Sequence, residues 1–322
     1  MKILITGVAG MIGSHLSRYL LEKGHTIIGI DNLSGGYREY VDSRVKFFEL
    51  DLVDVHQLDR VFADTKPDYV YHLAAYAAEG LSPFIRNFNY NNNLICSVNV
   101  VNNCIRQDVK KIIFTSSMAV YGAGKAPFKE SDSPSPADPY GIAKLAVEMD
   151  LKQAFDQFGL KYSIVRPHNV IGIYQNIWDK YRNVIGIWIR QTMSGKPITI
   201  FVDGNQTRAF TDVKYIMEAL VKLMDIDCDV CNIGSDKFYT INEVADMFKA
   251  IGAKIVHIEE RHEVKNAYCD HNKAKKVLGF NDKTNVPDLI NDMFDWAKKE
   301  PDRKTKIMKY EIDKHMYESW KN

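Results

Sequence analysis

The sequence predicts an α/β fold, a doubly wound parallel sheet with a smaller, interleaved C-terminal lobe. Three observations support this prediction. Short apolar runs rich in Val, Ile, Phe and Tyr alternate with amphipathic stretches through the first half of the chain. The runs are almost continuously apolar, as strands are when helices cover both faces of a sheet. After Pro167 the rhythm changes to longer, more polar segments that contain tryptophan, which indicates a second lobe.

The expected elements follow in order along the chain. Strands are expected at residues 2–6, 26–31, 45–51, 69–75, 111–117 and 162–167. The helix after the first strand begins at Met11 or Ile12 and places Leu16 and Leu20 on one face. Residues 1–167 form the sheet domain, and residues 168–322 form mainly the second lobe, with segments that return to the sheet. This lobe should contain strands within 197–204 and 227–235, a helix at 241–252 and a charged helical tail at 298–322.

Charge and composition exclude several classes of function. Lys and Arg total 42 against 41 Asp and Glu, so no large basic field would attract nucleic acid or an anionic membrane. The N-terminus lacks an export signal, and no run approaches the roughly 18 apolar residues of a membrane span. Five scattered cysteines suit reduced thiols, and we expect a cytoplasmic protein. Cys228 and Cys231 form a C-x-x-C pair without a matching second pair, so we interpret them as core thiols, not as a metal site.

The first strand runs directly into a glycine-rich turn. Gly7, Gly10 and Gly13 give the pattern G-x-x-G-x-x-G, and the next helix opens at Met11 or Ile12 within it. Glycine lets the backbone turn sharply and approach a diphosphate, whose charge then meets the N–H groups at the start of the helix. Such a triplet also occurs in ordinary tight turns. Placed between a strand and a helix, it predicts a dinucleotide site of the Rossmann type.

The next strand ends support a dinucleotide and indicate which one. Asp31 ends the second strand, followed by Asn32, and its carboxylate can accept hydrogen bonds from both ribose hydroxyls of an adenosine. The same charge would repel a 2′-phosphate, so NAD is favoured over NADP, although Arg38 lies nearby. Asp51, with Leu52 beside it, is a candidate partner for the adenine.

The fourth strand ends in small residues. Leu73, Ala74 and Ala75 follow His72 at a point where the chain would have to pass close to the cofactor. A lone histidine at the end of an apolar strand is more often packed than catalytic. We therefore interpret His72 as structural and the three residues after it as cofactor neighbours.

Three side chains are suited to taking a proton from an alcohol. Tyr140 and Lys144 are four residues apart and lie on the same face of a predicted helix. A free phenol has a pKa near ~10, and a nearby ammonium together with an oxidised nicotinamide would favour the phenolate. Ser117, at the end of the fifth strand, can hold the same substrate oxygen. The pair alone could be a solvated helix face, but together with the glycine turn it predicts hydride and proton transfer at a carbinol.

Seven motifs occur in order along the chain: TGVAGMIG, DNLS, HLAA, TSSMAVYG, PYGIAK, RPHNVIG and DGNQTRAFTDV. Together they resemble the nucleotide-sugar epimerases of the extended short-chain dehydrogenase/reductase family, from residue 1 to about residue 295. The resemblance implies that Tyr140 is the general base, Lys144 its partner and a ribose ligand, and Ser117 a ligand of the substrate oxygen.

The resemblance also implies further neighbours of the cofactor and the sugar phosphates. Asn92 falls at a family position beside the cofactor, with Asn93 as the alternative register, and Cys96 stands where relatives usually carry glycine. His168 would lie beside the nicotinamide through its backbone. Asn169 would face the sugar phosphates.

The two residues after Ser117 narrow the chemistry within this family. Sugar 4,6-dehydratases carry an Asp-Glu pair there and 3,5-epimerases a cysteine, whereas this chain has Met118 and Ala119. Hydride transfer with a single proton remains, and it predicts C4 epimerisation of a UDP-hexose or UDP-N-acetylhexosamine through a 4-keto sugar. A C4 dehydrogenase or reductase, a GDP-sugar epimerase and a non-catalytic NAD-binding regulator are the alternatives.

The expected substrate ligands lie mainly in the second lobe. By resemblance, Arg208 and Arg261 clamp the diphosphate, and Asn183 reaches the phosphate and base, although any one arginine could instead form a surface salt bridge. Ala267 leaves room in the sugar pocket for an N-acetyl group. Glu79 is either a functional residue, as a second acid/base or a ligand of a sugar hydroxyl, or a solvated loop charge. The segment that contains Glu79 and Ser82 resembles the GDP-mannose 3,5-epimerase group.

Relatives in the family commonly form homodimers through a four-helix bundle. The helices would be those around residues 92–106 and after Tyr140. The apolar residues of the expected interface are Val98, Val101, Ile105, Leu145, Met149 and Leu151. Packing against the sheet would explain the same positions.

Overall fold

The computed structural model describes residues 1–227, 229–259 and 264–321. Its centre is a seven-stranded sheet in the order β11-β6-β5-β4-β1-β2-β3, in which every neighbouring pair is parallel. The strands are β1 (Lys2–Thr6), β2 (Thr26–Asp31), β3 (Lys46–Glu49), β4 (Tyr69–His72), β5 (Lys111–Thr115), β6 (Tyr162–Pro167) and β11 (Val230–Ile233). All six strands predicted in the first half are present, and the strand predicted within 227–235 returns to the sheet as its edge.

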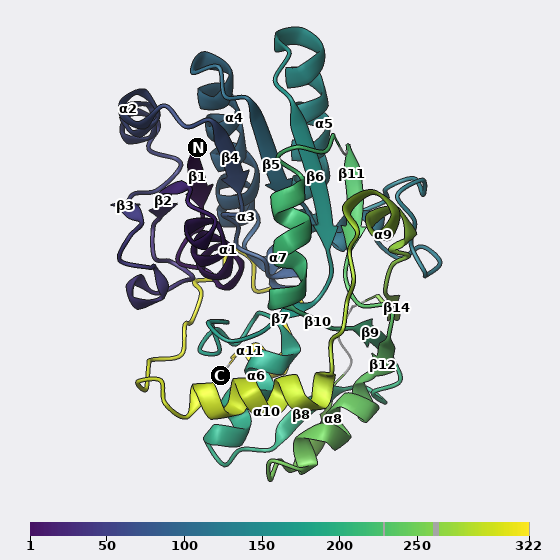
Figure 1. The fold of residues 1–322 in the computed structure, drawn as a ribbon. Coiled ribbons are helices and arrows are strands. Elements are labelled where there is room, and N and C mark those ends of the chain that lie inside the picture. Colours follow the sequence, from purple (N-terminus) through teal and green to yellow (C-terminus); the bar gives the residue numbers. More distant parts are fainter. Residues whose placement is uncertain (228, 260–263, 322) are drawn as a thin grey trace.

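Helices cover both faces of this sheet (Figure 1). On one face, α1 (Met11–Glu22) and α7 (Val213–Lys222) pack together over an apolar cluster that includes Leu16 and Leu20, with α9 (Asn272–Leu278) beside them. On the other face, α2 (Val55–Thr65), α4 (Cys96–Arg106) and α5 (Pro139–Phe158) form a second cluster. Val101 and Leu151 belong to this cluster and are buried, so the prediction that they lie in a subunit interface is wrong.

The order of the strands determines where a ligand can bind. The chain starts in the middle of the sheet at β1, fills one side with β2 and β3, and then crosses to β4 on the other side. In doubly wound sheets the crevice for a ligand opens at the carboxyl ends of the two strands that flank such a reversal. The glycine turn after β1 and the HLAA segment after β4 lie at these ends.

The second lobe has its own apolar core below the sheet in Figure 1. It contains the helices α6 (Val184–Met193), α8 (Ile241–Lys249) and α10 (Val286–Ala297). Its short sheets pair β7 (Val170–Ile171) with β10 (Thr211–Asp212), β8 (Ile198–Phe201) with β13 (Ile255–Ile258), and β9 (Thr207–Ala209) with both β12 (Phe238–Thr240) and β14 (Asn266–Ala267). The strand and helix predicted in this lobe correspond to β8 and α8, and a capping box between Thr240 and Glu243 explains where α8 begins.

Short helical segments lie in the connections between the strands of the sheet domain. They are η1 (Arg38–Tyr40), η2 (Glu79–Phe84), α3 (Arg86–Tyr90), the π-helix η3 (Asn91–Ile95) and η4 (Met118–Tyr121). Within the described part of the chain, no helix has the length and apolar character needed to cross a membrane.

The prediction of a helical tail is wrong. After α10 ends at Ala297, the described chain has only the short helix α11 (Glu318–Lys321). Pro301 and a run of charged residues interrupt any helical apolar stripe. The tail crosses instead to the segment after β4, where Met316 and Trp320 pack with Leu81 and Phe84.

Candidate active site

The glycine turn has no room for a side chain at Gly7 or at Gly13. Gly7 has a φ of +72°, and a Cβ on it would lie 2.8 Å from the backbone nitrogen of Ala74. A Cβ on Gly13 would lie 2.2 Å from the carbonyl oxygen of Gly7. The turn between β1 and α1 therefore requires glycine for both conformation and contact. Gly10 caps α1, and Met11, Ile12 and Gly13 form the first turn of that helix. The N–H groups of this turn lie at the positive end of the helix dipole.

A pocket opens at the carboxyl ends of the strands, with about 650 Å³ of space when its open mouth is included. Predicted cofactor residues line it from the glycine turn and from the segments after β2, β3 and β4. They are Gly7, Gly10, Asp31, Asn32, Asp51, Leu52, Leu73, Ala74, Ala75 and Asn92. Many of the residues that line this pocket were therefore predicted from the sequence alone.

Asp31 lies at the pocket end of β2. Its two oxygens accept backbone hydrogen bonds from Ala9, at 3.0 Å, and from Leu33, at 2.8 Å. Burial raises the pKa of Asp31, and these two hydrogen bonds oppose the rise. Asn32 Nδ2 donates to Asp51 Oδ2 at 3.0 Å, so the two predicted adenosine neighbours fix each other. A glycine cradle, a helix N-terminus and a carboxylate at the end of β2 together fit a dinucleotide such as NAD.

The π-helix η3 gives Asn92 and Asn93 different surroundings. Asn92 lines the pocket, whereas Asn93 is fully buried and accepts a hydrogen bond from the backbone nitrogen of Tyr76 at 2.9 Å. Asn93 therefore holds the segment after β4, and Asn92 is the candidate cofactor neighbour. Cys96 also lines the pocket, and its thiol donates to the carbonyl oxygen of Asn92 at 2.8 Å.

The three predicted catalytic side chains meet where β5 ends and α5 begins. Ser117 and Tyr140 are both buried, and the Ser117 hydroxyl lies close enough to the phenol to lower the pKa of Tyr140. Lys144 is also buried. Its ammonium donates to the carbonyl oxygen of Thr115 at 2.8 Å and lies 5.8 Å from the centroid of the Tyr140 ring. The sequence spacing thus does bring a hydroxyl, a phenol and an ammonium together.

Burial dominates the electrostatics of the protein alone. It lowers the pKa of Lys144 to about 8. It raises the pKa of Tyr140, and the negative charge of Glu79 raises it further, while the Ser117 hydroxyl acts in the opposite direction. The protein alone therefore favours the neutral phenol, and the expected lowering of the Tyr140 pKa would require additional positive charge from the bound cofactor.

Two side chains hold the first turn of α5, which carries Tyr140. One of them was selected from the sequence and the other was not. Asp138, which we did not select, caps α5 by accepting from the backbone nitrogen of Gly141 at 2.9 Å. Ser82, expected near the sugar, accepts from the backbone nitrogen of Tyr140 at 3.2 Å and donates to the backbone oxygen of Glu79 at 2.8 Å. The signal for Asp138 was available, because Asp before Pro at the start of a helix is a strong N-cap pattern.

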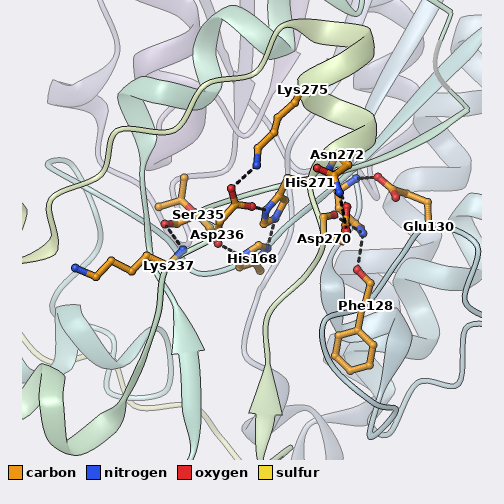
Figure 2. Close-up of polar contacts among 12 residues, drawn as sticks. Phe128, Glu130, His168, Ser235, Asp236, Lys237, Asp270, His271, Asn272 and Lys275 are labelled. Atoms are coloured by element: carbon orange, nitrogen blue, oxygen red, sulfur yellow. Dashed lines mark hydrogen bonds and ion pairs between the residues drawn. The ribbon is translucent and has the colours of Figure 1, made fainter.

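The two histidines that the sequence singled out are both packed. His72 is fully buried between Thr6 and Ser97, as expected for a structural residue. Figure 2 shows the ring of His168 against that of His271, with ring centroids 4.8 Å apart. His271 in turn contacts Asp236, at 2.9 Å. Burial lowers the pKa of His168 to about 3, so its side chain stays neutral where it packs against His271.

The predicted substrate residues lie in several elements. Asn169 has a φ of +40°, and its Nδ2 is buried without a hydrogen-bond partner in the described structure, which suits a group that meets a ligand. Asn183 caps α6 by accepting from the backbone nitrogen of Ile185 at 3.0 Å. Glu79 is exposed at the start of η2, yet its negative charge raises the pKa of Tyr140. Arg261 lies outside the described residues.

A residue predicted to bind the diphosphate and one predicted to line the sugar pocket lie on paired strands. Ala267 on β14 pairs in register with Arg208 on β9. Ala267 is buried in an apolar cluster that also contains Met118, the residue after Ser117. The predicted sugar pocket and the catalytic serine therefore belong to neighbouring parts of the structure.

Arg182 and Tyr76 line the same pocket as the glycine turn but were not selected from the sequence. Arg182 comes from the second lobe and carries no motif. Tyr76 immediately follows the HLAA segment. Their Arg-aromatic contact, with the guanidinium carbon 4.4 Å from the ring centroid, is long-range in sequence and could not be anticipated.

The fold and this site define a nucleotide-dependent enzyme of the Rossmann type, with a serine, tyrosine and lysine set beside the dinucleotide pocket. A family model described as the NAD dependent epimerase/dehydratase family matches residues 3–234. The chain belongs to this family.

Relatives extend the similarity over nearly the whole chain. The UDP-glucose 4-epimerase of Lactobacillus helveticus is 30% identical, over 94% of this chain and 98% of its own. The solved UDP-glucose 4-epimerase of Thermotoga maritima, with UDP-glucose, superimposes with a TM-score of 0.89 at 32% identity and covers 93% of this chain and 99% of its own. The UDP-N-acetylglucosamine 4-epimerase of Methanobrevibacter ruminantium, in complex with UDP-N-acetylmuramic acid, gives 0.85 at 29% identity, with 92% and 98% covered.

Proposed function

We propose that this protein is an NAD-dependent nucleotide-sugar 4-epimerase that acts on a UDP-hexose or UDP-N-acetylhexosamine through a transient 4-keto sugar. The observation that carries the proposal is that Ser117, Tyr140 and Lys144 are buried together where β5 ends and α5 begins, with the Lys144 ammonium 5.8 Å from the centroid of the Tyr140 ring. The 4-epimerase relatives support the choice of reaction.

Each residue of the site has a separate role in the proposed reaction. Bound NAD would be held by the glycine turn and Asp31 and would supply reversible acceptance of the C4 hydrogen as hydride. Ser117 holds the C4 oxygen of the sugar. Tyr140 takes the proton of that hydroxyl. It returns the proton after the 4-keto sugar has turned its opposite face toward the cofactor. Lys144 supports the phenolate by its positive charge.

The sugar nucleotide must stay bound while its ring turns, so its diphosphate needs a separate anchor. We propose Arg208 and Arg261 for this role, with Asn169 and Asn183 as neighbours of the phosphates and base. Ala267 leaves space beside Met118 for an N-acetyl group, and Glu79 borders the sugar. Residues 1–167 supply the cofactor site and the three catalytic side chains, and residues 168–322 supply most of the sugar-nucleotide site.

A homodimer is part of the proposal. Ile95, Ile142 and Met149 are exposed apolar side chains on η3 and α5, with exposed fractions of 46%, 43% and 64%. Such an apolar surface on adjacent helices suits helix packing between two subunits. Sedimentation of the wild type and of Met149→Glu tests this, because the dimer should dissociate in the variant. We also propose a cytoplasmic location, since Cys96, Cys104, Cys231 and Cys269 are buried thiols.

One experiment separates the proposed reaction from its alternatives. The purified protein is incubated without added NAD with UDP-glucose, UDP-N-acetylglucosamine and GDP-mannose, and the products are separated by chromatography. Formation of the C4 epimer of a UDP-sugar is expected. Accumulation of reduced cofactor would instead indicate a dehydrogenase, and turnover of GDP-mannose alone a GDP-sugar epimerase. No turnover of any of the three would contradict the proposal.

A further inference from the structure

A cation from the second lobe reaches into the cofactor pocket. Arg182 lies between β7 and α6 and lines the pocket together with Gly7, Gly10 and Asp31. A Cβ on Gly35 would lie 2.6 Å from a terminal nitrogen of the Arg182 guanidinium. A Cβ on the next residue, Gly36, would lie 2.7 Å from the backbone nitrogen of Gly10. Two consecutive glycines thus let the guanidinium and the glycine turn both lie close against the loop after β2.

The guanidinium is held in place by a buried carboxylate. Asp179 is 1% exposed, and its Oδ2 lies 3.2 Å from Arg182 Nε and accepts from the Tyr76 hydroxyl at 3.0 Å. Asp179 Oδ1 accepts from the backbone nitrogen of Tyr181 at 3.0 Å. The Tyr76 ring lies against the guanidinium carbon at 4.4 Å. These contacts restrain the arginine before any ligand binds, which lowers the conformational cost of binding.

The C-terminal tail braces the same segment. The backbone nitrogen of Lys306 donates to the carbonyl oxygen of Trp178 at 2.9 Å, and its ammonium donates to the carbonyl oxygen of Ser34 at 2.5 Å. Ser34 itself lines the pocket. The tail therefore joins the segment that carries Arg182 to the loop after β2.

The position of the charge suits an anionic ligand. The positive charge of Arg182 lowers the pKa of Asp31, which lines the pocket, and that of Tyr140, which does not line it, against the larger effect of burial on each. In the described structure, Arg182 Nε is buried without an aligned hydrogen-bond acceptor. A guanidinium presents paired donors that match phosphate oxygens.

We propose that Arg182 binds the diphosphate of the dinucleotide cofactor, so that the second lobe contributes a cation to a site otherwise built from the sheet domain. The inference rests on the proposed function, because it takes the glycine-turn pocket to be the NAD site. The diphosphate of the sugar nucleotide has the same chemistry. The cofactor is the occupant we assign because Arg182 shares its pocket with the glycine turn and Asp31.

The test measures binding rather than turnover. NAD and UDP are titrated calorimetrically into cofactor-stripped wild type, Arg182→Gln and Arg190→Gln. Arg190 is the matched control, because it also pairs with an aspartate, Asp302 at 2.8 Å, but does not line the pocket described here. Loss of a charge-assisted hydrogen bond should weaken NAD binding about tenfold or more in Arg182→Gln. UDP binding, and both affinities in Arg190→Gln, should stay within about twofold of wild type.

A second measurement needs no variant. Phenylglyoxal modifies accessible arginines, and NAD should slow the modification of Arg182 in the wild-type protein, read by peptide mass, while UDP should not. Equal NAD affinity in wild type and Arg182→Gln, or protection of Arg182 by UDP alone, would contradict the inference and leave the proposed function intact. A wild-type protein that binds no NAD would contradict both.

Discussion

The Lys144 ammonium lies 5.8 Å from the centroid of the Tyr140 ring, one helical turn along α5, and both side chains are buried. Burial disfavours the charged form of each, since it lowers the pKa of the lysine and raises that of the tyrosine. The protein alone thus keeps the phenol protonated. Catalysis by the phenolate then depends on positive charge that arrives with the oxidised cofactor, which would couple proton removal to cofactor binding.

Tyr140→Phe should abolish turnover without loss of NAD. The ring and its packing remain, but the group that takes the substrate proton is gone, and such groups contribute about 10²- to 10⁴-fold to rate. The measurement is kcat with the best UDP-sugar, together with the NAD released per chain on denaturation. Tyr162→Phe, at the start of β6, is the control and should behave as wild type. Turnover within about tenfold of wild type in Tyr140→Phe would exclude Tyr140 as the base.

The buried lysine should give stability a specific pH dependence. The folded-state pKa of Lys144 is about 8, below its ordinary value of 10.5. Between these values the unfolded state binds more protons than the folded state, so the free energy of unfolding rises with pH, by about 1.4 kcal/mol per pH unit. Below pH 8 both states are protonated and the full cost of burying the charge applies.

Urea unfolding of wild type and Lys144→Met at pH 7, 8 and 9.5 tests this. Relative to the variant, the wild type should gain about 2 kcal/mol between pH 8 and 9.5 and little between 7 and 8. Measurements stop at 9.5 because unfolded tyrosines begin to ionise near ~10. A constant difference between the two proteins across this range would show that the pKa of Lys144 is not lowered.

The sequence predicted the sheet and much of the pocket for a physical reason. The glycine turn, Asp31 and the HLAA segment are short patterns next to strands, and parallel strands bring their carboxyl ends to one edge. The Tyr140 and Lys144 pair needs only helical spacing. Each of these features is local, so one segment of sequence carries the whole signal.

Arg182 and the tail could not be predicted in the same way. Arg182 reaches the pocket because Tyr76 and Lys306, from two distant segments, meet the segment that carries Asp179 and Arg182. The tail has the charge and spacing of a solvated helix, but its few apolar residues find partners around Leu81 and Phe84 instead. Tertiary contacts decide both outcomes, and neither leaves a periodic pattern in the sequence.

Glu79→Gln should shift the pH profile of the reaction. The charge of Glu79 raises the pKa of Tyr140, so its removal lowers that pKa and the phenolate forms at lower pH. The ascending limb of kcat/KM against pH should therefore move to lower pH, with the maximum close to wild type. Glu22→Gln, which removes an exposed carboxylate paired with Arg44, should leave the profile unchanged.

The same variant tests whether Glu79 is itself a second acid or base. If its carboxylate is itself an acid or base, kcat should fall about 10²-fold or more at every pH instead of shifting with pH. A profile identical to wild type would mean that the charge of Glu79 does not act on Tyr140 during the reaction.

Ala267→Tyr should remove activity on UDP-N-acetylglucosamine selectively. Ala267 is 7% exposed, and the cluster around it includes Met118, next to the catalytic serine. A phenol ring placed there would fill the space that an N-acetyl group needs, whereas UDP-glucose carries only a hydroxyl at that position. We expect kcat/KM for UDP-N-acetylglucosamine to fall at least about tenfold more than that for UDP-glucose, since misfit of a few atoms in a pocket costs about 1–3 kcal/mol.

Two controls make the comparison specific. Ala267→Ser adds a single atom and should preserve the wild-type ratio of the two kcat/KM values. The thermal midpoint of Ala267→Tyr, measured with bound NAD, shows whether the cluster tolerates the ring, because overpacking a core typically costs about 1–3 kcal/mol. If the folded variant keeps its activity on UDP-N-acetylglucosamine while that on UDP-glucose falls, Ala267 does not border the N-acetyl group, and the selectivity must come from residues other than this β14 position.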